Sequence, residues 1–331
     1  MSDLNNDFPI LITPGDAAGI GPEVAIKALA NRNFDCNFKL VGPEWLWIQT
    51  SERFSVPINA DFINVPSLSN IPEQKINYGE ISPMFGKIAM ECLRTAAEEC
   101  LNKKAAGIVT APLTKAGIHL AGYKYQGHTD FLAEISNTPK HAMMLSTGNL
   151  RVLLVTHHQS ILSVPNSLST EKIVEKIELA YECGKKLNIE SPKIAVCALN
   201  PHAGENCAFG DEEIRIISPA IKKLRENKIN VTGPYPSDTL FYRAANGEFD
   251  FVIAMYHDQG LIPVKLIGFE NGVNTTLGLP FVRTSPDHGS AYDIAGKGIA
   301  NPESMISAIE MAIKLTFNLK PVPQPTAAAT T

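Results

Sequence analysis

The stretch IAVCALNPH, residues 194–202, is an apolar, strand-like run that ends in a histidine, and the same pattern occurs twice more. LLVTHH (153–158) leads to His157, and FVIAMYH (251–257) leads to His257. In a parallel α/β sheet the strand ends meet along one edge, so these distant residues can converge. Three neutral imidazoles at one point suit a borderline divalent metal with one position left open. The sequence therefore predicts a metal site at His157, His202 and His257; alternatively, each histidine is an ordinary polar residue at a strand end.

Apolar runs and helical patterns alternate along the rest of the chain. Strands are predicted at 9–13, 38–42, 107–110, 151–156, 193–199, 250–255 and 261–267. Helices are predicted to start at Pro22, at Ser82-Pro83 (to about 103), Ser169 (to about 187), Asp211 (to about 228) and Pro302 (to about 319). This alternation favours parallel sheets with helices on both faces.

The composition narrows the classes of protein. A chain of 331 residues suggests two domains, and 44% hydrophobic with 19% charged residues is typical of a soluble globular protein. The net charge of -5 and the absence of basic runs argue against nucleic-acid binding. No segment predicts a signal peptide or a membrane span, and six cysteines without a C-x-x-C pair suggest reduced thiols in the cytoplasm. The Pro/Thr/Ala-rich tail 321–331 predicts disorder.

Several short motifs carry possible chemistry, but neither the Rossmann G-x-G-x-x-G fingerprint nor a P-loop is present. The glycine-rich corner ITPGDAAGIGPEV (12–24) leads into a helix N-terminus, which can bind an anion or simply form a tight turn. In GHTDF (127–131) Thr129 can bind a ligand or cap a helix. Lys265, Asn274 and Arg283 together could hold a phosphate or carboxylate, although each alone is more typical of a surface group.

Together these segments resemble the 4-hydroxythreonine-4-phosphate dehydrogenase (PdxA) family. The matching stretches are TPGDAAGIGPEV, GHTDFLA, LNPHAGE, GPYPSDTLF, MYHDQGLIPVK and GVNTTLGLPFVRTSPDHGSAYDIAGKG, from residue 13 to about 300. The resemblance implies metal ligands at His157, His202 and His257, of which His157 is chosen over its neighbour His158. It implies substrate contacts at His128, Thr129, Lys265, Asn274 and Arg283.

A more distant similarity links HGSAYDIAGKGIANP to the adenosine-binding loop of the isopropylmalate and isocitrate dehydrogenases. It implies an α/β protein with their two-lobed α/β/α architecture rather than a Rossmann fold. The cofactor is then expected to be NAD, with NADP possible, at His288, Gly289, Ala291, Asp293 and Asn301. One divalent metal per subunit is expected, zinc by its histidine ligands, with magnesium or cobalt possible.

The reaction that the family resemblance implies is oxidation of the C3 hydroxyl of 4-phosphooxy-L-threonine. The product is a β-keto acid that loses CO2 to give 3-amino-2-oxopropyl phosphate, a step of pyridoxal 5'-phosphate (vitamin B6) biosynthesis. Lys265, Asp238 and Asp258 are the candidate catalytic residues. Either aspartate can be the general base or a group that orients a histidine.

Three alternatives remain open at this point. A sister dehydrogenase would act on D-threonate or D-erythronate 4-phosphate. A zinc hydrolase would use the same three histidines, and a metal-binding scaffold would have no activity.

The resemblance also implies an organisation of the chain. One lobe is expected from 1–125 plus 268–320, with the cofactor loop, and the other from 126–267, with the metal histidines. A homodimer with its active site at the subunit interface is expected, with a small phosphorylated hydroxy-amino acid as substrate and neither nucleic acid nor membrane as partner.

Overall fold

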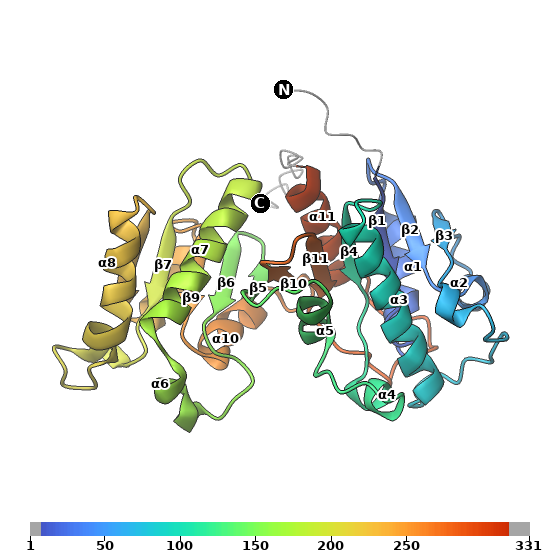
Figure 1. Ribbon diagram of the computed structural model, residues 1–331, viewed down its shortest axis with the longest axis horizontal. Helices are drawn as coiled ribbons and strands as arrows, with labels where there is room; N and C mark the ends of the chain where they lie inside the picture. Colours follow the sequence, from blue (N-terminus) through green and yellow to red (C-terminus); the bar gives the residue numbers. More distant parts are fainter. Residues whose placement is uncertain (1–7, 318–331) are drawn as a thin grey trace, which may run out of the picture.

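The computed structural model describes residues 8–317, and within them eleven strands form one continuous sheet. The order across the sheet is β3-β2-β1-β4-β11-β10-β5-β6-β9-β7-β8 (Figure 1). The strands are β1 (Ile10–Thr13), β2 (Phe38–Val41), β3 (Asp61–Ile63), β4 (Gly107–Thr110), β5 (Ala142–Thr147), β6 (Leu150–Leu154), β7 (Ile194–Cys197), β8 (Val231–Tyr235), β9 (Phe251–Ala254), β10 (Val273–Leu277) and β11 (Val282–Pro286).

Helices cover both faces of this sheet (Figure 1). The α-helices are α1 (Gly21–Asn31), α2 (Glu44–Phe54), α3 (Pro83–Leu101), α4 (Lys115–Leu120), α5 (His128–Ile135), α6 (Val164–Ser167), α7 (Thr170–Lys186), α8 (Ser218–Glu226), α9 (Ser237–Ala245), α10 (His257–Gly268) and α11 (Glu303–Phe317). Short 3-10 turns η1 (Pro66–Leu68), η2 (Ile161–Ser163) and η3 (Pro201–Gly204) and a π-helical turn η4 (Glu213–Ile217) complete the elements.

In strands β5, β6, β7 and β9 alternate residues pack into two separate cores, because successive side chains of a strand point to opposite faces. In β6 the side chain of Leu153 packs with Ile173 of α7 in the larger core. Its neighbours Val152 and Leu154 pack with Leu261 of α10 in the smaller core. The continuous apolar runs of the sequence follow from this burial on both faces.

The strand directions agree with the predicted parallel sheet only on its two flanks. β1 runs parallel to β2 and β4, and β9 runs parallel to β6 and β7. In the centre, β10 pairs antiparallel with both β11 and β5, and β5 pairs antiparallel with β6. The reason is local: β5 and β6 are joined by a two-residue turn in which Gly148 has φ 53°, and such a turn can only connect antiparallel strands.

One predicted strand is wrong, because residues 261–267 belong to helix α10. Leu261 and Val264, three residues apart, are buried, whereas Ile262 and Leu266 are exposed by 63% and 84%. Apart from Lys265, the run is apolar on both its buried and its exposed side, so its composition hides the helical period. Pro263 is the seventh of the twelve residues of this helix, and a proline is unfavourable in the interior of a strand as well as in that of a helix.

The predicted helices agree with the structure more closely. Ser169 caps α7, since its hydroxyl accepts a hydrogen bond from the backbone N–H of Lys172. The helix predicted from Asp211 divides into the π-turn η4 and α8. The last helix, α11, is described to Phe317, and the tail 321–331 lies outside the described residues. Within residues 8–317, no helix has both the length and the apolar character needed to span a bilayer.

Candidate active site

A cleft of about 550 Å³ opens beside the antiparallel centre of the sheet. Its walls come from segments that are far apart in sequence: the end of β4, the start of α5, the loop after β6, helix α10, and strands β10 and β11 with the loop that follows. Five predicted substrate residues line it together: His128, Thr129, Lys265, Asn274 and Arg283. The fold therefore brings this predicted group to one place.

Arg283 is the most unusual member of the group, because its guanidinium is buried without a carboxylate partner. Its side chain comes from β11 and is only 3% exposed. It donates hydrogen bonds to the hydroxyls of Thr110 (Nη2 to Oγ1, 2.7 Å) and Thr276 (Nη1 to Oγ1, 3.0 Å). Burial lowers its pKa to about 9. An uncompensated buried cation is unfavourable unless an anion binds beside it.

His128 lies at the first position of α5 and stays neutral. Burial and the neighbouring charge of Arg283 lower its pKa well below the ordinary value. A hydrogen bond with the backbone of Ala111 raises the pKa but does not offset these two effects. Its neighbour Thr129 lies within 3.4 Å of the hydroxyl of Thr276. Opposite them, Asn274 leaves its buried Oδ1 without a hydrogen-bond partner. Buried polar atoms are usually paired, so an open one in a cleft indicates a ligand position.

Two of the three predicted metal ligands, His157 and His257, line the same cleft. His257 begins α10, and its Nδ1 is 2.7 Å from Oδ1 of Asp258. An ionised Asp258 accepts a hydrogen bond from Nδ1–H, so the proton stays on Nδ1 and the lone pair of Nε2 is free for a ligand. The sequence prediction passed over His158, whose ring lies 5.7 Å from that of His257. Burial lowers the pKa of both His157 and His158 and keeps them neutral.

His202 does not join these histidines in one chain. It lies on the exposed turn η3, outside the cleft, with its ring 6.1 Å from that of Phe209. Among residues 8–317 no three His, Cys, Asp or Glu side chains are grouped so that they could hold a metal ion. A single chain therefore supplies only part of the donor set that the family resemblance implies.

The predicted cofactor residues divide between the cleft and the surface. His288 and Gly289 line the cleft, and the buried Nε2 of His288 has no hydrogen-bond partner. Ala291, Asp293 and Asn301 do not line it. They lie further along the loop 288–301, and the side chains of Asp293 and Asn301 are exposed.

The loop 288–301 is held firmly against the N-terminal half of the chain. The hydroxyl of Tyr292 donates to Oδ2 of buried Asp16 at 2.5 Å. Burial, followed by this hydrogen bond, raises the pKa of Tyr292 to about 12. At the other end, Lys27 Nζ donates to the carbonyl of Gly298 at 2.8 Å. The glycine-rich corner, for which the sequence left anion binding and a tight turn open, packs against this loop, since Ile20 N–H donates to Ser290 O at 3.0 Å.

The two predicted general bases lie outside the cleft. Asp238 is an exposed residue in the first turn of α9, and Asp258 has a side chain that is 71% exposed. The sequence prediction missed Asp287, which lines the cleft and forms an ion pair with Lys265 at 2.8 Å. Its position directly before the predicted cofactor loop was the available signal.

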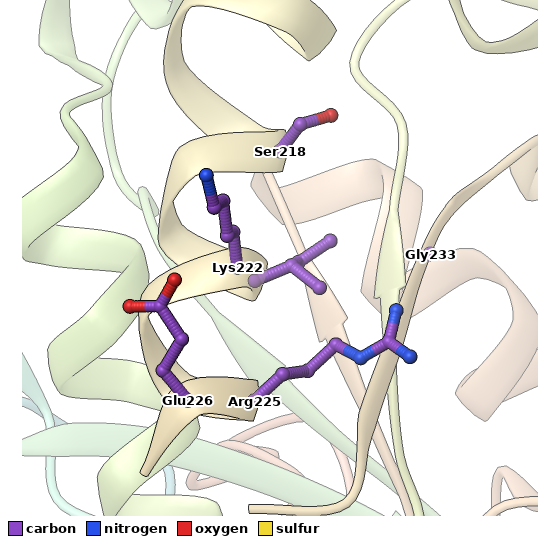
Figure 2. A pocket seen from close by; sticks show the side chains of 6 residues that line it. Ser218, Lys222, Arg225, Glu226 and Gly233 are labelled. Atoms are coloured by element: carbon purple, nitrogen blue, oxygen red, sulfur yellow. The ribbon is translucent and has the colours of Figure 1, made fainter.

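A second hollow lies far from these residues, between α8 and β8 at the edge of the sheet. Figure 2 shows Lys222, Arg225 and Glu226 on the turns of α8 that line it. It is open, and its lining includes no histidine. The chemistry of the protein is therefore sought in the central cleft.

The fold is an α/β architecture without a Rossmann domain. A β-decarboxylating dehydrogenase from Thermococcus kodakarensis superposes with a TM-score of 0.51 at 16% identity, over 93% of this chain and 83% of that one. At this identity the likeness concerns the fold alone, and it agrees with the architecture predicted from the sequence.

Closer matches define the family. The model for "Pyridoxal phosphate biosynthetic protein PdxA" matches residues 25–312, and the chain belongs to this family of oxidoreductases. The crystal structure of 4-hydroxythreonine-4-phosphate dehydrogenase from Klebsiella pneumoniae is 40% identical, with a TM-score of 0.82, over 93% of this chain and 99% of that one.

Two curated relatives carry different names at similar identity. A putative D-threonate 4-phosphate dehydrogenase from Oceanobacillus iheyensis is 44% identical over 93% of this chain and 98% of its own length. A 4-hydroxythreonine-4-phosphate dehydrogenase from Desulforapulum autotrophicum is 41% identical over 93% and 96%. The chain is thus a dehydrogenase of the PdxA family, and membership in this family leaves the hydrolase and scaffold alternatives without support.

Proposed function

We propose that this enzyme oxidises the C3 hydroxyl of 4-phosphooxy-L-threonine with a nicotinamide cofactor. A hydride passes from C3 to NAD, the hydroxyl proton is released, and the alcohol becomes a ketone. The β-keto acid then loses CO2 to give 3-amino-2-oxopropyl phosphate, a step toward pyridoxal 5'-phosphate. The enzyme works in the cytoplasm, and the free thiols of all six cysteines fit that compartment.

The observation that carries this proposal is the buried, unpaired guanidinium of Arg283 in the cleft, with Lys265 and Asn274 on the same walls. A guanidinium offers two parallel donors to a phosphate or carboxylate, and such charge-assisted bonds are the strong ones. His128 is neutral, so it adds a hydrogen-bonding group without repelling the Arg283 guanidinium. The Thr129 hydroxyl adds another. A substrate with both a phosphate and a carboxylate suits this cation-rich wall.

The cofactor is NAD, with NADP as a poorer substitute, bound along the loop 288–301. The open Nε2 of His288 at the cleft end of the loop supports this position. The cleft then separates two lobes, 1–125 with 268–320 and 126–267. The sheet order supports this division, because β1–β4, β10 and β11 lie on one side and β5–β9 on the other (Figure 1).

A homodimer is proposed because one side of α10, next to the cleft, is apolar and exposed. Ile262, Leu266 and Phe269 are exposed by 63%, 84% and 70%. Large contiguous apolar patches on a soluble protein commonly mark an interface. A second chain docked there would bring its own side chains to the cleft. The cleft of one chain lacks His202, which lies on an exposed turn, so the partner's His202 is the residue proposed to complete the histidine set.

One divalent ion per subunit, zinc with magnesium or cobalt as alternatives, is proposed to bind His257, His157 and the partner's His202. Bound there, it would favour the alkoxide form of the substrate hydroxyl. Because the ring of His158 lies 5.7 Å from that of the cleft residue His257, the choice between His157 and His158 needs a test. When cobalt is titrated in and followed by visible absorption, the variant that removes the true ligand should bind cobalt at least tenfold more weakly. His157→Ala and His158→Ala serve as controls for each other.

D-threonate 4-phosphate is a second candidate substrate, because the relative at 44% identity carries that name. The two molecules differ at C2, where one has an ammonium group and the other a hydroxyl. The deciding experiment follows absorbance at 340 nm with each compound and NAD. A higher kcat/KM for D-threonate 4-phosphate would replace the first proposal, and no NADH from any phosphorylated hydroxy acid would refute both.

A further inference from the structure

Asp287 stands at the junction between the substrate wall and the cofactor loop. It directly follows β11, which carries Arg283, and directly precedes His288, where the loop 288–301 begins. Its side chain lines the cleft and its Oδ2 is 2.8 Å from Nζ of Lys265. We propose that Asp287 is a positioning residue that fixes the Lys265 ammonium in the cleft for the anionic part of the substrate.

Lys265 needs such a partner because of where it lies. It is in the last part of α10, and its side chain is 38% exposed. A lysine has four flexible side-chain bonds and a compact charge, so alone it would occupy many rotamers. Apart from the ion pair, its Nζ lies 5.3 Å from the centre of the exposed Phe269 ring. The carboxylate of Asp287 therefore supplies the strong contact that selects one position for Nζ.

Asp287 can act in this way because its own backbone is anchored. Its N–H donates to the carbonyl of Gly272 at 3.1 Å and lies 3.2 Å from the hydroxyl of Ser304. Ser304 in turn donates to the same Gly272 carbonyl at 2.6 Å. A side chain at Gly272 would place its Cβ 3.1 Å from the Cβ of Asp287, so the two segments are in close contact. The carboxylate thus projects from a fixed point.

The ion pair leaves Lys265 able to bind an anion. An ammonium group has three donors, and one bond to Asp287 leaves two for the substrate. Holding Nζ in place before the substrate arrives reduces the ordering cost of binding. This inference rests on the proposed function, because it assigns Lys265 to the substrate.

The kinetic test is a double-mutant cycle with Asp287→Asn and Lys265→Met, assayed on the phosphorylated acid that the wild type oxidises. Asp287→Asn should raise the substrate KM about tenfold, which corresponds to about 1.4 kcal/mol, and change the NAD KM less than about twofold. In the Lys265→Met background the same change should alter the substrate KM less than about twofold, because its effect acts through Lys265. Ser304→Ala, which loosens the backbone anchor of Asp287 but keeps both charges, should raise the substrate KM less than Asp287→Asn does.

A second readout needs no substrate. Acetylation of the free enzyme by acetic anhydride, followed by peptide mass spectrometry, should modify Lys265 at least threefold faster in Asp287→Asn, because the ammonium loses its partner. The exposed Lys297 provides the internal reference. Unchanged acetylation at Lys265, or fully additive KM effects in the cycle, would overturn the inference. A wild type that oxidises no phosphorylated acid would refute the proposed function but leave the acetylation result to decide the role of Asp287.

Discussion

Arg283 shows most clearly how one residue gives the cleft its chemistry. Strand β11 carries it into the protein interior, where threonine hydroxyls rather than carboxylates accept its hydrogen bonds. These neutral partners orient the guanidinium without cancelling its charge. The site therefore keeps a positive potential that an aspartate or glutamate at either threonine would remove.

Replacing Arg283 with lysine should raise the substrate KM roughly ten- to hundredfold, because the paired donors are lost and charge-assisted bonds contribute about 1.5–3 kcal/mol. The NAD KM should change little. Steady-state kinetics in both substrates checks this, and Arg94→Lys on α3 is a control outside the cleft. A KM for the phosphorylated acid that stays at the wild-type value would remove Arg283 from substrate binding.

His128 makes the stability of the protein depend on pH. In the folded state its pKa is well below 6.5, mainly through burial, whereas the unfolded chain titrates near 6.5. Below about pH 6.5 the unfolded state therefore binds a proton that the folded state does not, and stability falls as the pH drops toward the folded pKa. Urea unfolding at pH 7.5 and 5.5 should show a smaller loss in His128→Gln than in the wild type. An equal loss in both proteins would contradict this.

At the scale of elements, the sequence predicted those helix starts that are marked by residues within the same short segment. Ser169 caps a helix and Ser82-Pro83 precede one, and each of these starts agrees with the structure. The strand predicted at Leu261–Ile267 is wrong. This run is apolar on its buried side and also on its exposed side, which is a proposed subunit contact, so Lys265 alone does not mark the helical period. β10 and β11 were not predicted at all, since their threonines and Pro286 resemble a loop until the neighbouring strands pair with them.

The cleft residues were foreseen through family resemblance rather than through spacing. Lys265, Asn274 and Arg283 come from a helix and two antiparallel strands, and no periodicity predicts that these meet. His158 and Asp287 were missed for the same reason, because only the tertiary structure shows their neighbours.

The loop 288–301 is the element that we expect to select the cofactor. Asp293 is exposed on it, and a carboxylate there suits the free 2′-hydroxyl of NAD but repels the 2′-phosphate of NADP. Asp293→Ser should therefore improve kcat/KM for NADP relative to NAD about tenfold or more. The NAD to NADP ratio in the wild type and in this variant is the measurement, with Asp61→Ser as a control on another exposed carboxylate. A ratio that does not move would mean that the adenosine binds elsewhere.

At the scale of the whole molecule, one continuous sheet carries all of the site in its middle. The antiparallel centre, β11-β10-β5, joins two parallel flanks, so residues from both ends of the chain reach one cleft. Of the three predicted metal ligands, only His202 lies apart, on the far side of β9. If the site is shared between two chains, its histidines must come from different subunits, and this can be measured directly.

We expect that two inactive variants regain activity when they are mixed. His202→Ala removes the histidine proposed to come from the partner, and His257→Ala removes one that lines the cleft of its own chain. In a heterodimer of the two, one site combines the intact His257 of one chain with the partner's intact His202, while the other site lacks both. Random reassociation gives about half heterodimers with one good site each, so activity should recover to about a quarter of the wild-type value. The variants are mixed in mild denaturant, refolded by dilution and assayed at 340 nm, with each variant refolded alone as the control. If all three histidines came from one chain, no site in the heterodimer would be complete, and the mixture would stay inactive although sedimentation showed dimers.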